Sequence, residues 1–376
     1  MSEQNSLVAC FSDLPDPRMV NKCRHQLLDI IGIAICATIA NADTWADIAE
    51  FAEGKAQWLK QWLALPNGIP SADTFRRVFE HLDSNAFQAR FHQWMQTVFR
   101  VTEGQVIALD GKVVRGTCDA QGQGGLHLVS AWATVNRLTL GQVKVADKAN
   151  EIGAIPQLLE LLMLKGCIVT LDAIGCQKTI VTAIRQQQAD YVVTVKGNQP
   201  HLYQHLQNAF ARQDAVGFSG FSPDYCRTEE RGHGRFEQRE CWVLRDQTAP
   251  ALGWTDGQTL VRVKRTTQRG TRPLSEETQF YLTSLPLLAS LVLGAIRAHW
   301  GIENQCHWVL DVTFREDASR TRSRNADDNL AVLRKIALNL VRQHPAKGAL
   351  KRKRYRAALN EDFLFDVIQS SFNLMQ

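Results

Sequence analysis

The sequence predicts an α/β fold built around a mixed β-sheet. Short apolar runs, such as Val106–Asp110 and Cys167–Leu171, are typical of buried strands. Segments with helical periodicity separate the later runs, as the crossovers between parallel strands require. The two runs between residues 127 and 146 meet at Asn136-Arg137, which indicates an antiparallel hairpin. The sheet is therefore expected to contain both parallel and antiparallel strands.

Composition limits the class of protein without choosing its function. The 376 residues suit two or three structural units, and 45% hydrophobic with 22% charged residues is ordinary for a soluble globular chain. A formal net charge of +5 fits a nucleic-acid partner, although many basic proteins bind no DNA. The nine cysteines are scattered without a Cys-x-x-Cys pair, which predicts reduced thiols in the cytoplasm. No signal-peptide pattern is present, and the most apolar run, Ile30–Ala40, is too short to span a bilayer, so we expect a buried helix and no membrane partner.

Residues 1–100 are predicted to form a helical N-terminal domain. Two helices are expected before residue 65, at Leu27–Ile39 and Thr44–Leu63. Ser71 then caps a helix that directs Arg76 and Arg77 outward. A helix, a turn and a helix with two arginines could dock on DNA. An ordinary helical bundle with solvated arginines explains the same pattern.

Residues 101–376 are predicted to form a second domain, whose first part contains an ordered series of strands and helices. The expected elements are strands at Val106–Asp110, His127–Thr134, Leu138–Ala146, Cys167–Leu171 and Tyr191–Lys196, and helices at Ile152–Leu164, Gln177–Gln188 and His201–Arg212. This is the element order of the RNase H-like fold. Acids collect at the ends of the first and fourth strands of that fold, where Asp110 and Asp172 lie here.

The pattern changes again in the rest of the chain. Residues at about 215–285 alternate like antiparallel strands, and we expect a β-rich insertion in the core rather than a separate domain. Residues from about 286 to 343 are helical. The basic run Lys351-Arg-Lys-Arg-Tyr-Arg356 predicts a basic helical C-terminus. Such runs are usually solvated, but near DNA they supply affinity for phosphate.

Three acids are candidates for a magnesium site. Two-metal phosphodiester chemistry needs carboxylates that converge on one point, and two or three are sufficient because Mg2+ keeps several waters. Asp110 and Asp172 lie on strands that can be neighbours. A third acid must come from a helix across the strand ends, and Glu303, in the expected helix Ala295–Leu310, is our candidate. Mn2+ is the alternative ion.

The surroundings of Glu303 allow other interpretations. His299 and His307 lie four residues to either side of it and share its helical face. This spacing could indicate zinc, but it is not the His-Glu-x-x-His pattern of metalloproteases. A structural stripe with satisfied histidines is the plainer interpretation. Glu316 and Asp317 are other candidates for the third acid.

Four motifs resemble those of the bacterial H-repeat-associated proteins, a DDE insertion-sequence transposase family. They are Ala108-Leu-Asp-Gly-Lys112, Leu171-Asp-Ala173 with Gln177-Lys178, Asp190-Tyr-Val-Val-Thr-Val-Lys-Gly-Asn-Gln199, and the long run from His299 to Asp317. The resemblance covers essentially the whole chain. It implies an RNase H-like core interrupted by a strand-rich insertion before the last catalytic helix. It also implies that Asp110, Asp172 and Glu303 bind Mg2+ and act in the cutting and joining of DNA.

The helix that carries Glu303 departs from some relatives. Related transposases with such an insertion often have Tyr-Arg-x-Arg-Trp-x-x-Glu, with a Lys seven residues beyond the Glu. Here Ile296, His299 and Leu310 stand where the Tyr, the second Arg and the Lys would be. Trp300 keeps the position that stacks on a flipped base in some relatives. Hairpin-forming chemistry is therefore in doubt, whereas metal-dependent strand cleavage is not.

These observations predict a Mg2+-dependent transposase in the cytoplasm, with endonuclease activity at the ends of its own insertion element. Its partner would be double-stranded DNA, and by analogy it would act as a homodimer because synapsis holds two ends. Arginines, lysines and one aromatic side chain are the expected DNA contacts: Lys112, Arg115, Lys196, Arg297, Trp300, Arg76 and Arg77. The alternative is a transposase-derived DNA-binding or recombination-associated protein without catalytic activity.

Overall fold

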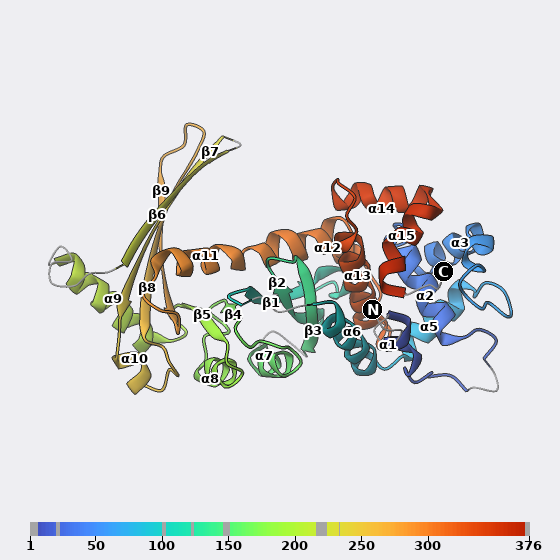
Figure 1. Cartoon of the computed structure of the whole chain (residues 1–376), viewed down its shortest axis with the longest axis horizontal. Helices are drawn as coiled ribbons and strands as arrows, with labels where there is room; N and C mark the ends of the chain where they lie inside the picture. The colour runs from blue at the N-terminus through green and yellow to red at the C-terminus, as the bar shows by residue number, and fades with distance from the viewer. Residues whose placement is uncertain are drawn as a thin grey trace.

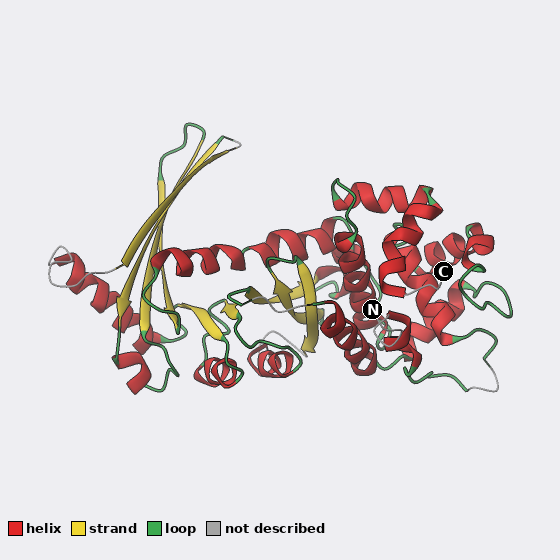
Figure 2. Cartoon of the chain, in the orientation of Figure 1, coloured by secondary structure: helices red, strands yellow, loops and turns green. Residues whose placement is uncertain are grey.

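The protein is elongated, with a helical module at one end and a long antiparallel ribbon at the other (Figure 1). A computed structural model describes residues 7–19, 23–99, 103–121, 124–145, 151–215, 224–232 and 234–372. The part of the sheet between the two ends has helices on both faces (Figure 2). This arrangement confirms the predicted mixed α/β fold.

All nine described strands form one sheet, in the order β3-β2-β1-β4-β5-β9-β8-β7-β6. The strands are β1 (Val106–Val114), β2 (Leu126–Ala133), β3 (Leu138–Val145), β4 (Ile168–Leu171), β5 (Asp190–Val195), β6 (Asp224–Gly232), β7 (Arg235–Arg245), β8 (Thr259–Arg269) and β9 (Ser275–Thr283). The first three strands pair antiparallel, whereas β4 and β5 run parallel to β1. This is the strand arrangement expected of the RNase H-like core.

The register between β1 and β4 places two acids side by side. The last pair in this parallel ladder is Leu109↔Leu171, and the next residue on each strand is Asp110 or Asp172. β1 is longer than predicted, because residues as far as Val114 pair with β2. Asp110 therefore lies within the strand and not at its end.

The β-rich insertion extends the sheet, as predicted. β9 pairs antiparallel with β5, and β8, β7 and β6 follow in turn. Its first two strands form a hairpin, because β6 ends at Gly232 and β7 begins at Arg235. Strands β6, β7, β8 and β9 form the ribbon that projects from the molecule in Figure 1.

Helices cover the two faces of the central sheet. On one face α7 (Glu151–Glu160) contacts β2 and β3, and α8 (Lys178–Gln186) contacts β5. On the other face α11 (Ala289–His299) contacts β1 and β4, and α12 (Trp308–Val312) follows it along the same edge (Figure 1). The α9 helix (Pro200–Ala215) and the short α10 helix (Thr248–Ala251) lie beside the insertion.

The helical module combines both ends of the chain around α13 (Ala326–Gln343). This helix is buried along most of its length and contacts α2, α5, α6 and α15. The other helices of the module are α1 (Leu7–Ser12), α2 (Leu27–Ile39), α3 (Trp45–Gly54), α4 (Ala56–Leu59), α5 (Ala72–His81), α6 (Ser84–Val98), α14 (Leu350–Leu359) and α15 (Glu361–Phe372). The apolar α2 is a buried helix, as predicted. The prediction of one helix over residues 44–63 is wrong, because the helix is interrupted at Lys55. The preceding residue, Gly54, is a poor helix former.

The predicted cap at Ser71 is present, and its hydroxyl accepts a hydrogen bond from the Thr74 backbone N–H at 3.3 Å. Phe75, Val78 and Phe79 of α5 are buried, while Arg77 is exposed. None of the described helices is long and apolar enough to cross a membrane.

The basic run at 351–356 is only partly a solvated surface. Lys351 and Arg352 are exposed, but Arg354 is 1% exposed. Its guanidinium donates hydrogen bonds to the carbonyl oxygens of Thr38 and Thr313 and lies 3.9 Å from the centroid of the Phe314 ring. Arg354 therefore joins α14 to the N-terminal helices and to the segment after α12.

Replacing Arg354 with Ala should lower the free energy of unfolding by about 2–4 kcal/mol, because two carbonyl groups lose their donor. Arg352→Ala, two residues away and exposed, should change it by less than about 0.5 kcal/mol. Urea denaturation of both variants tests this difference, and equal midpoints would contradict the assigned role.

Candidate functional site

Asp110 and Asp172 come from neighbouring strands, but their side chains have different partners. Asp172 directly follows β4, and its Oδ1 accepts hydrogen bonds from the backbone N–H groups of Ile174 and Gly175 at 3.0 and 3.2 Å. Asp110 lies in β1, and its Oδ2 is 3.4 Å from His307 Nδ1. The turn that starts α8 thus orients one carboxylate and the helix across the sheet orients the other.

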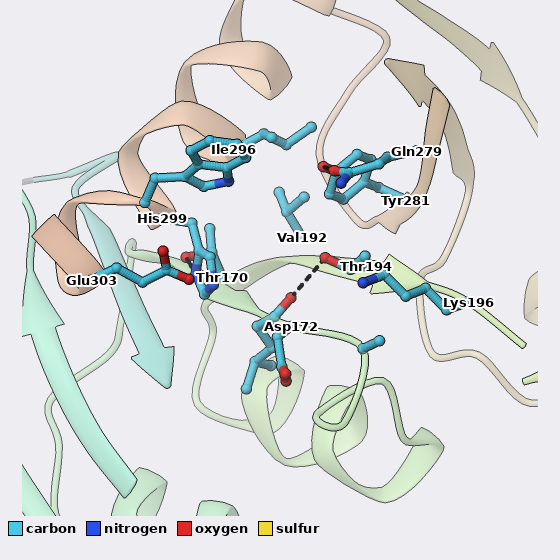
Figure 3. A pocket seen from close by; sticks show the side chains of 13 residues that line it. Thr170, Asp172, Val192, Thr194, Lys196, Gln279, Tyr281, Ile296, His299 and Glu303 are labelled. Carbon is cyan, nitrogen blue, oxygen red and sulfur yellow. Dashed lines mark hydrogen bonds between the residues drawn. The ribbon is translucent and has the colours of Figure 1, made fainter. Parts of the chain in front are cut away.

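Glu303 lies in a π-helical turn, Ile302–His307, between α11 and α12. The predicted helix over residues 295–310 is therefore present but is not α-helical throughout. Such a turn holds one extra residue in the helix, and π-turns often occur at functional sites. The turn contacts β1. Glu303 and Asp172 therefore lie on the same side of the sheet, as Figure 3 shows.

A cavity of 270 Å3 joins Asp172 to Glu303 (Figure 3). Lys196, at the end of β5, and Trp300, at the end of α11, also line it. Thr194 lies on its floor and donates a hydrogen bond to the Leu171 carbonyl oxygen at 3.3 Å. Two predicted DNA contacts, Lys196 and Trp300, thus line the same cavity as Asp172 and Glu303.

The three predicted acids are close enough for their charges to interact. The pKa of Asp110 is raised from 3.8 to about 7, chiefly by burial and then by the carboxylates of Asp172, Glu303 and Glu151. A hydrogen bond with Gly111 opposes this rise. Negative charge is therefore concentrated beside Asp110.

The donor set fits a hard divalent cation in its chemistry, since it consists of carboxylates that repel one another. As oriented here, however, no three His, Cys, Asp or Glu side chains of the described residues are close enough to hold one metal ion.

The two histidines beside Glu303 face separate partners. His299 Nδ1 is 2.9 Å from the Thr170 hydroxyl, and burial lowers the pKa of the imidazole. Burial and then the charge of Lys112 lower the pKa of His307 to about 3, so the ring is neutral at pH 7. This separation does not support the zinc interpretation and agrees with a positioning role for His307 next to Asp110.

Lys112 does not face the solvent. Its ammonium group donates to Asp311 and, at 2.6 Å, to Glu316, which is fully buried. Burial lowers the pKa of Lys112, but Glu316 and Asp311 outweigh this effect and raise it above the ordinary value. Lys112 therefore anchors α12 to β1, and the structure does not support a phosphate contact by this residue.

The remaining candidates are distributed over several surfaces. Glu316 accepts a hydrogen bond from Lys112, and Asp317 accepts one from the Arg115 backbone N–H at 3.0 Å. These contacts do not support either residue as the third acid beside Asp110 and Asp172. The Arg115 side chain is 86% exposed. Arg297 pairs with Glu230 of the insertion. Arg76 and Arg77, in the helical module, both pair with Asp73.

Sequence reasoning missed two residues near the site. Arg265 of β8 places its guanidinium 4.7 Å from the centroid of the Trp300 ring, in a neighbouring cavity of 210 Å3. Glu151, at the start of α7, has its carboxyl group against Gly111. Neither had a usable signal, because both come from distant segments and an acid in the first turn of a helix is common.

In metal-free protein, Asp110→Asn should stabilise the fold at pH 8. The native state favours protonated Asp110, so wild-type stability should fall as the pH rises from about 4 through the raised pKa of about 7. The rise from 3.8 to about 7 limits this difference to about 4 kcal/mol. Urea unfolding at pH 5 and pH 8 in EDTA measures it, and parallel pH profiles for the two proteins would contradict it.

Comparison with known proteins places this architecture in a family. Residues 101–340 match the family model described as Transposase DDE domain, and residues 8–95 match the one described as DDE_Tnp_1-associated. "Putative transposase YncI" of Escherichia coli O157:H7 is 40% identical over 98% of this chain and 96% of its own length. "H repeat-associated putative transposase YhhI" of Escherichia coli K12 is 34% identical over 98% of this chain and 99% of its own. A piggyBac transposase synaptic complex with hairpin DNA aligns over 99% of this chain and 78% of its own at 11% identity, with a TM-score of 0.47, a level from which nothing about function follows. The chain belongs to the DDE transposase family, and H repeat-associated transposases are among its relatives.

Proposed function

We propose that this transposase cuts and joins DNA at the ends of its own insertion element, with Asp110, Asp172 and Glu303 as the divalent-metal site. The main support for this proposal is the position of the three acids. Asp110 and Asp172 follow the last residue pair between β1 and β4, and Glu303 lies on the helix across that edge. This arrangement supports the assignment of Asp110, Asp172 and Glu303 as the two Asp and one Glu of a DDE transposase.

The proposed reaction is the attack of a water or a 3′-hydroxyl oxygen on the phosphorus of a phosphodiester, with loss of the bond to the leaving oxygen. Mg2+, with Mn2+ as a substitute, would lower the pKa of the attacking group and stabilise charge on the leaving oxygen. Asp110 of β1 and Asp172, which follows β4, would hold the ion, and Glu303 would complete the site from the helix. His307 keeps Asp110 oriented by its contact at 3.4 Å.

Lys196 and Trp300 are the strongest candidates for DNA contacts at this site. Lys196 is exposed at the rim of the cavity that contains Asp172 and Glu303, where its charge can meet a phosphate. Trp300 is 37% exposed and is backed by Arg265, so an unstacked base can contact its free surface. Arg265 and Arg239 of the insertion line the adjacent cavity, and they supply cationic partners that the helix sequence lacks.

The projecting ribbon offers a further basic surface. A cavity of 370 Å3 at its tip is lined by four arginines and one glutamate: Arg235, Arg265, Arg269, Arg272 and Glu277. Such a cluster can follow a phosphate backbone without reading its sequence. Binding of two element ends would then involve a homodimer in the cytoplasm, where we expect the protein to act on DNA.

Asp172→Asn should abolish Mg2+-dependent strand cleavage of DNA that carries the ends of the element encoding this chain. The substitution removes one ligand charge with almost no change in size. Asp366→Asn, an exposed position on α15, serves as the control and should cleave like wild type. Cleavage that survives Asp172→Asn would refute the site, and no cleavage by wild type would favour the inactive DNA-binding alternative.

Lys196→Ala should weaken binding of the same DNA and reduce the slope of log affinity against log salt by about 1, since one phosphate contact is lost. Lys165→Ala is a matched control, because Lys165 is exposed before β4 at the opposite end of that strand from Asp172. Fluorescence anisotropy at several salt concentrations measures both slopes. An unchanged slope for Lys196→Ala would remove this contact from the proposal.

A further inference from the structure

One face of the ribbon changes from apolar to basic where the ribbon extends beyond α11. Residues that are directly opposite in neighbouring strands point to the same face of a sheet. Near α11 this face belongs to an apolar cluster, through Cys241, Val243, Val261, Val263 and Tyr281. Farther out the same face is mainly charged, and we call this part the arginine face: Arg235, Glu237, Arg239, Arg265, Thr267, Arg269, Ser275 and Glu277.

A single buried glutamate holds three arginines of this face. Glu237 is 6% exposed, and its carboxylate lies 2.5 Å from guanidinium nitrogens of Arg235, Arg239 and Arg265. One carboxylate balances only one of these three charges. Each guanidinium has five N–H donors, so most of the donors remain for another anion. Glu237 therefore fixes the three arginines without cancelling their charge.

The outer part of the arginine face has still more unbalanced charge. Arg269 is exposed at the end of β8, and Arg272 is exposed in the turn that follows. Among the described residues, neither forms an ion pair with an acid. Glu277 lies 3.7 Å from Arg265 and is itself exposed. An excess of arginine on one exposed face attracts the phosphates of a nucleic acid.

Adjoining cavities connect the arginine face to the proposed metal site. The cavity beside Asp172 shares four lining residues with the cavity of 210 Å3: Gln279, Tyr281, Ile296 and Trp300. Figure 3 shows Gln279 and Tyr281 across from Glu303. The cavity of 210 Å3 in turn shares Arg265 with the cavity of 370 Å3 on the arginine face. The Trp300 ring, 4.7 Å from the Arg265 guanidinium, lies where the three cavities meet.

We infer that the arginine face binds an unpaired DNA strand that leaves the metal site past Trp300. The inference rests on the proposed function, since it names the form of the DNA beside the cut phosphate and its path. An aromatic ring for stacking together with cations along a groove is typical of single-strand binding. From Arg265 to Arg269, β8 advances about 14 Å. This is about the length of four stacked nucleotides.

The first experiment measures binding of unpaired DNA by fluorescence anisotropy in EDTA, without a metal ion. The probe is a fluorescein-labelled strand of mixed sequence and about 12 nucleotides, within the usual range of single-strand sites. Arg269→Ala should weaken binding by about 5-fold at about 0.1 M salt. It should also reduce the slope of log affinity against log salt by about 0.7, the share of one phosphate contact on a single strand.

Arg227→Ala is the matched control for Arg269→Ala and should bind the probe like wild type. Arg227 lies on β6 and is directly opposite Glu240. Since Glu240 follows Arg239 on β7, both Arg227 and Glu240 point to the other face of the ribbon. The control thus removes the same charge from the same ribbon. Circular dichroism of each variant checks that the fold is kept.

Trp300→Ala should weaken the same probe by about 5- to 150-fold, since one contact between a base and an aromatic ring is lost. Trp308→Ala is its control and should bind like wild type. Trp308 is 56% exposed on α12 and lines none of the three cavities. The proposed path needs both Trp300 and Arg269, so wild-type affinity in either variant would overturn it.

The duplex and a variant of the metal site separate this inference from the proposed function. The probe annealed to its complement should lose less affinity in Arg269→Ala than the single strand does. An equal or greater loss would overturn the assignment to unpaired DNA. Wild-type strand binding in Arg269→Ala, with cleavage lost in Asp172→Asn, would overturn the inference and leave the proposed function intact. Cleavage that survives Asp172→Asn would refute the metal site, and with it the path from that site, even where Arg269→Ala weakens strand binding.

Discussion

The rest of the site depends on the buried ion pairs that the Lys112 ammonium group makes. It joins β1 to Asp311 of α12 and to Glu316 in the segment that follows. Lys335 and Arg334 of α13 add positive charge near Glu316, and these cations together with Lys112 lower its pKa to about 2 in spite of its burial. Because Lys112 lies two residues after Asp110 on the same strand, it fixes the helix that carries Glu303 over the strand that carries Asp110.

The site combines this rigid anchor with a cluster of acids that oppose one another. Carboxylates from β1, from the end of β4 and from a π-helical turn are brought together by main-chain geometry, not by favourable contacts between them. A fold that only maximised stability would avoid such a cluster. Its persistence in a well-packed core is expected where stability is exchanged for function.

Much of the fold follows from the sequence, because buried strands and crossover helices leave strong local patterns. Apolar runs and helical periodicity predicted the order of strands and helices in the core, and alternating residues predicted the insertion. The Asp110–Asp172 pair was predictable because each Asp follows an apolar run. The role of Lys112 was not, since its partners Asp311 and Glu316 lie about two hundred residues away in the chain. The burial of Arg354 and the approach of Arg265 to Trp300 depend in the same way on tertiary packing.

The pairing of β5 with β9 has a consequence for how the chain can be divided. Without the insertion, β5 would become an open edge whose backbone groups face solvent, and Val192, Val193 and Val195 would lie along it. An apolar edge of this kind invites pairing with another chain. The insertion therefore covers the edge of the core with a strand. A shortened chain made by excising residues 224–283 would tend to aggregate instead of folding alone.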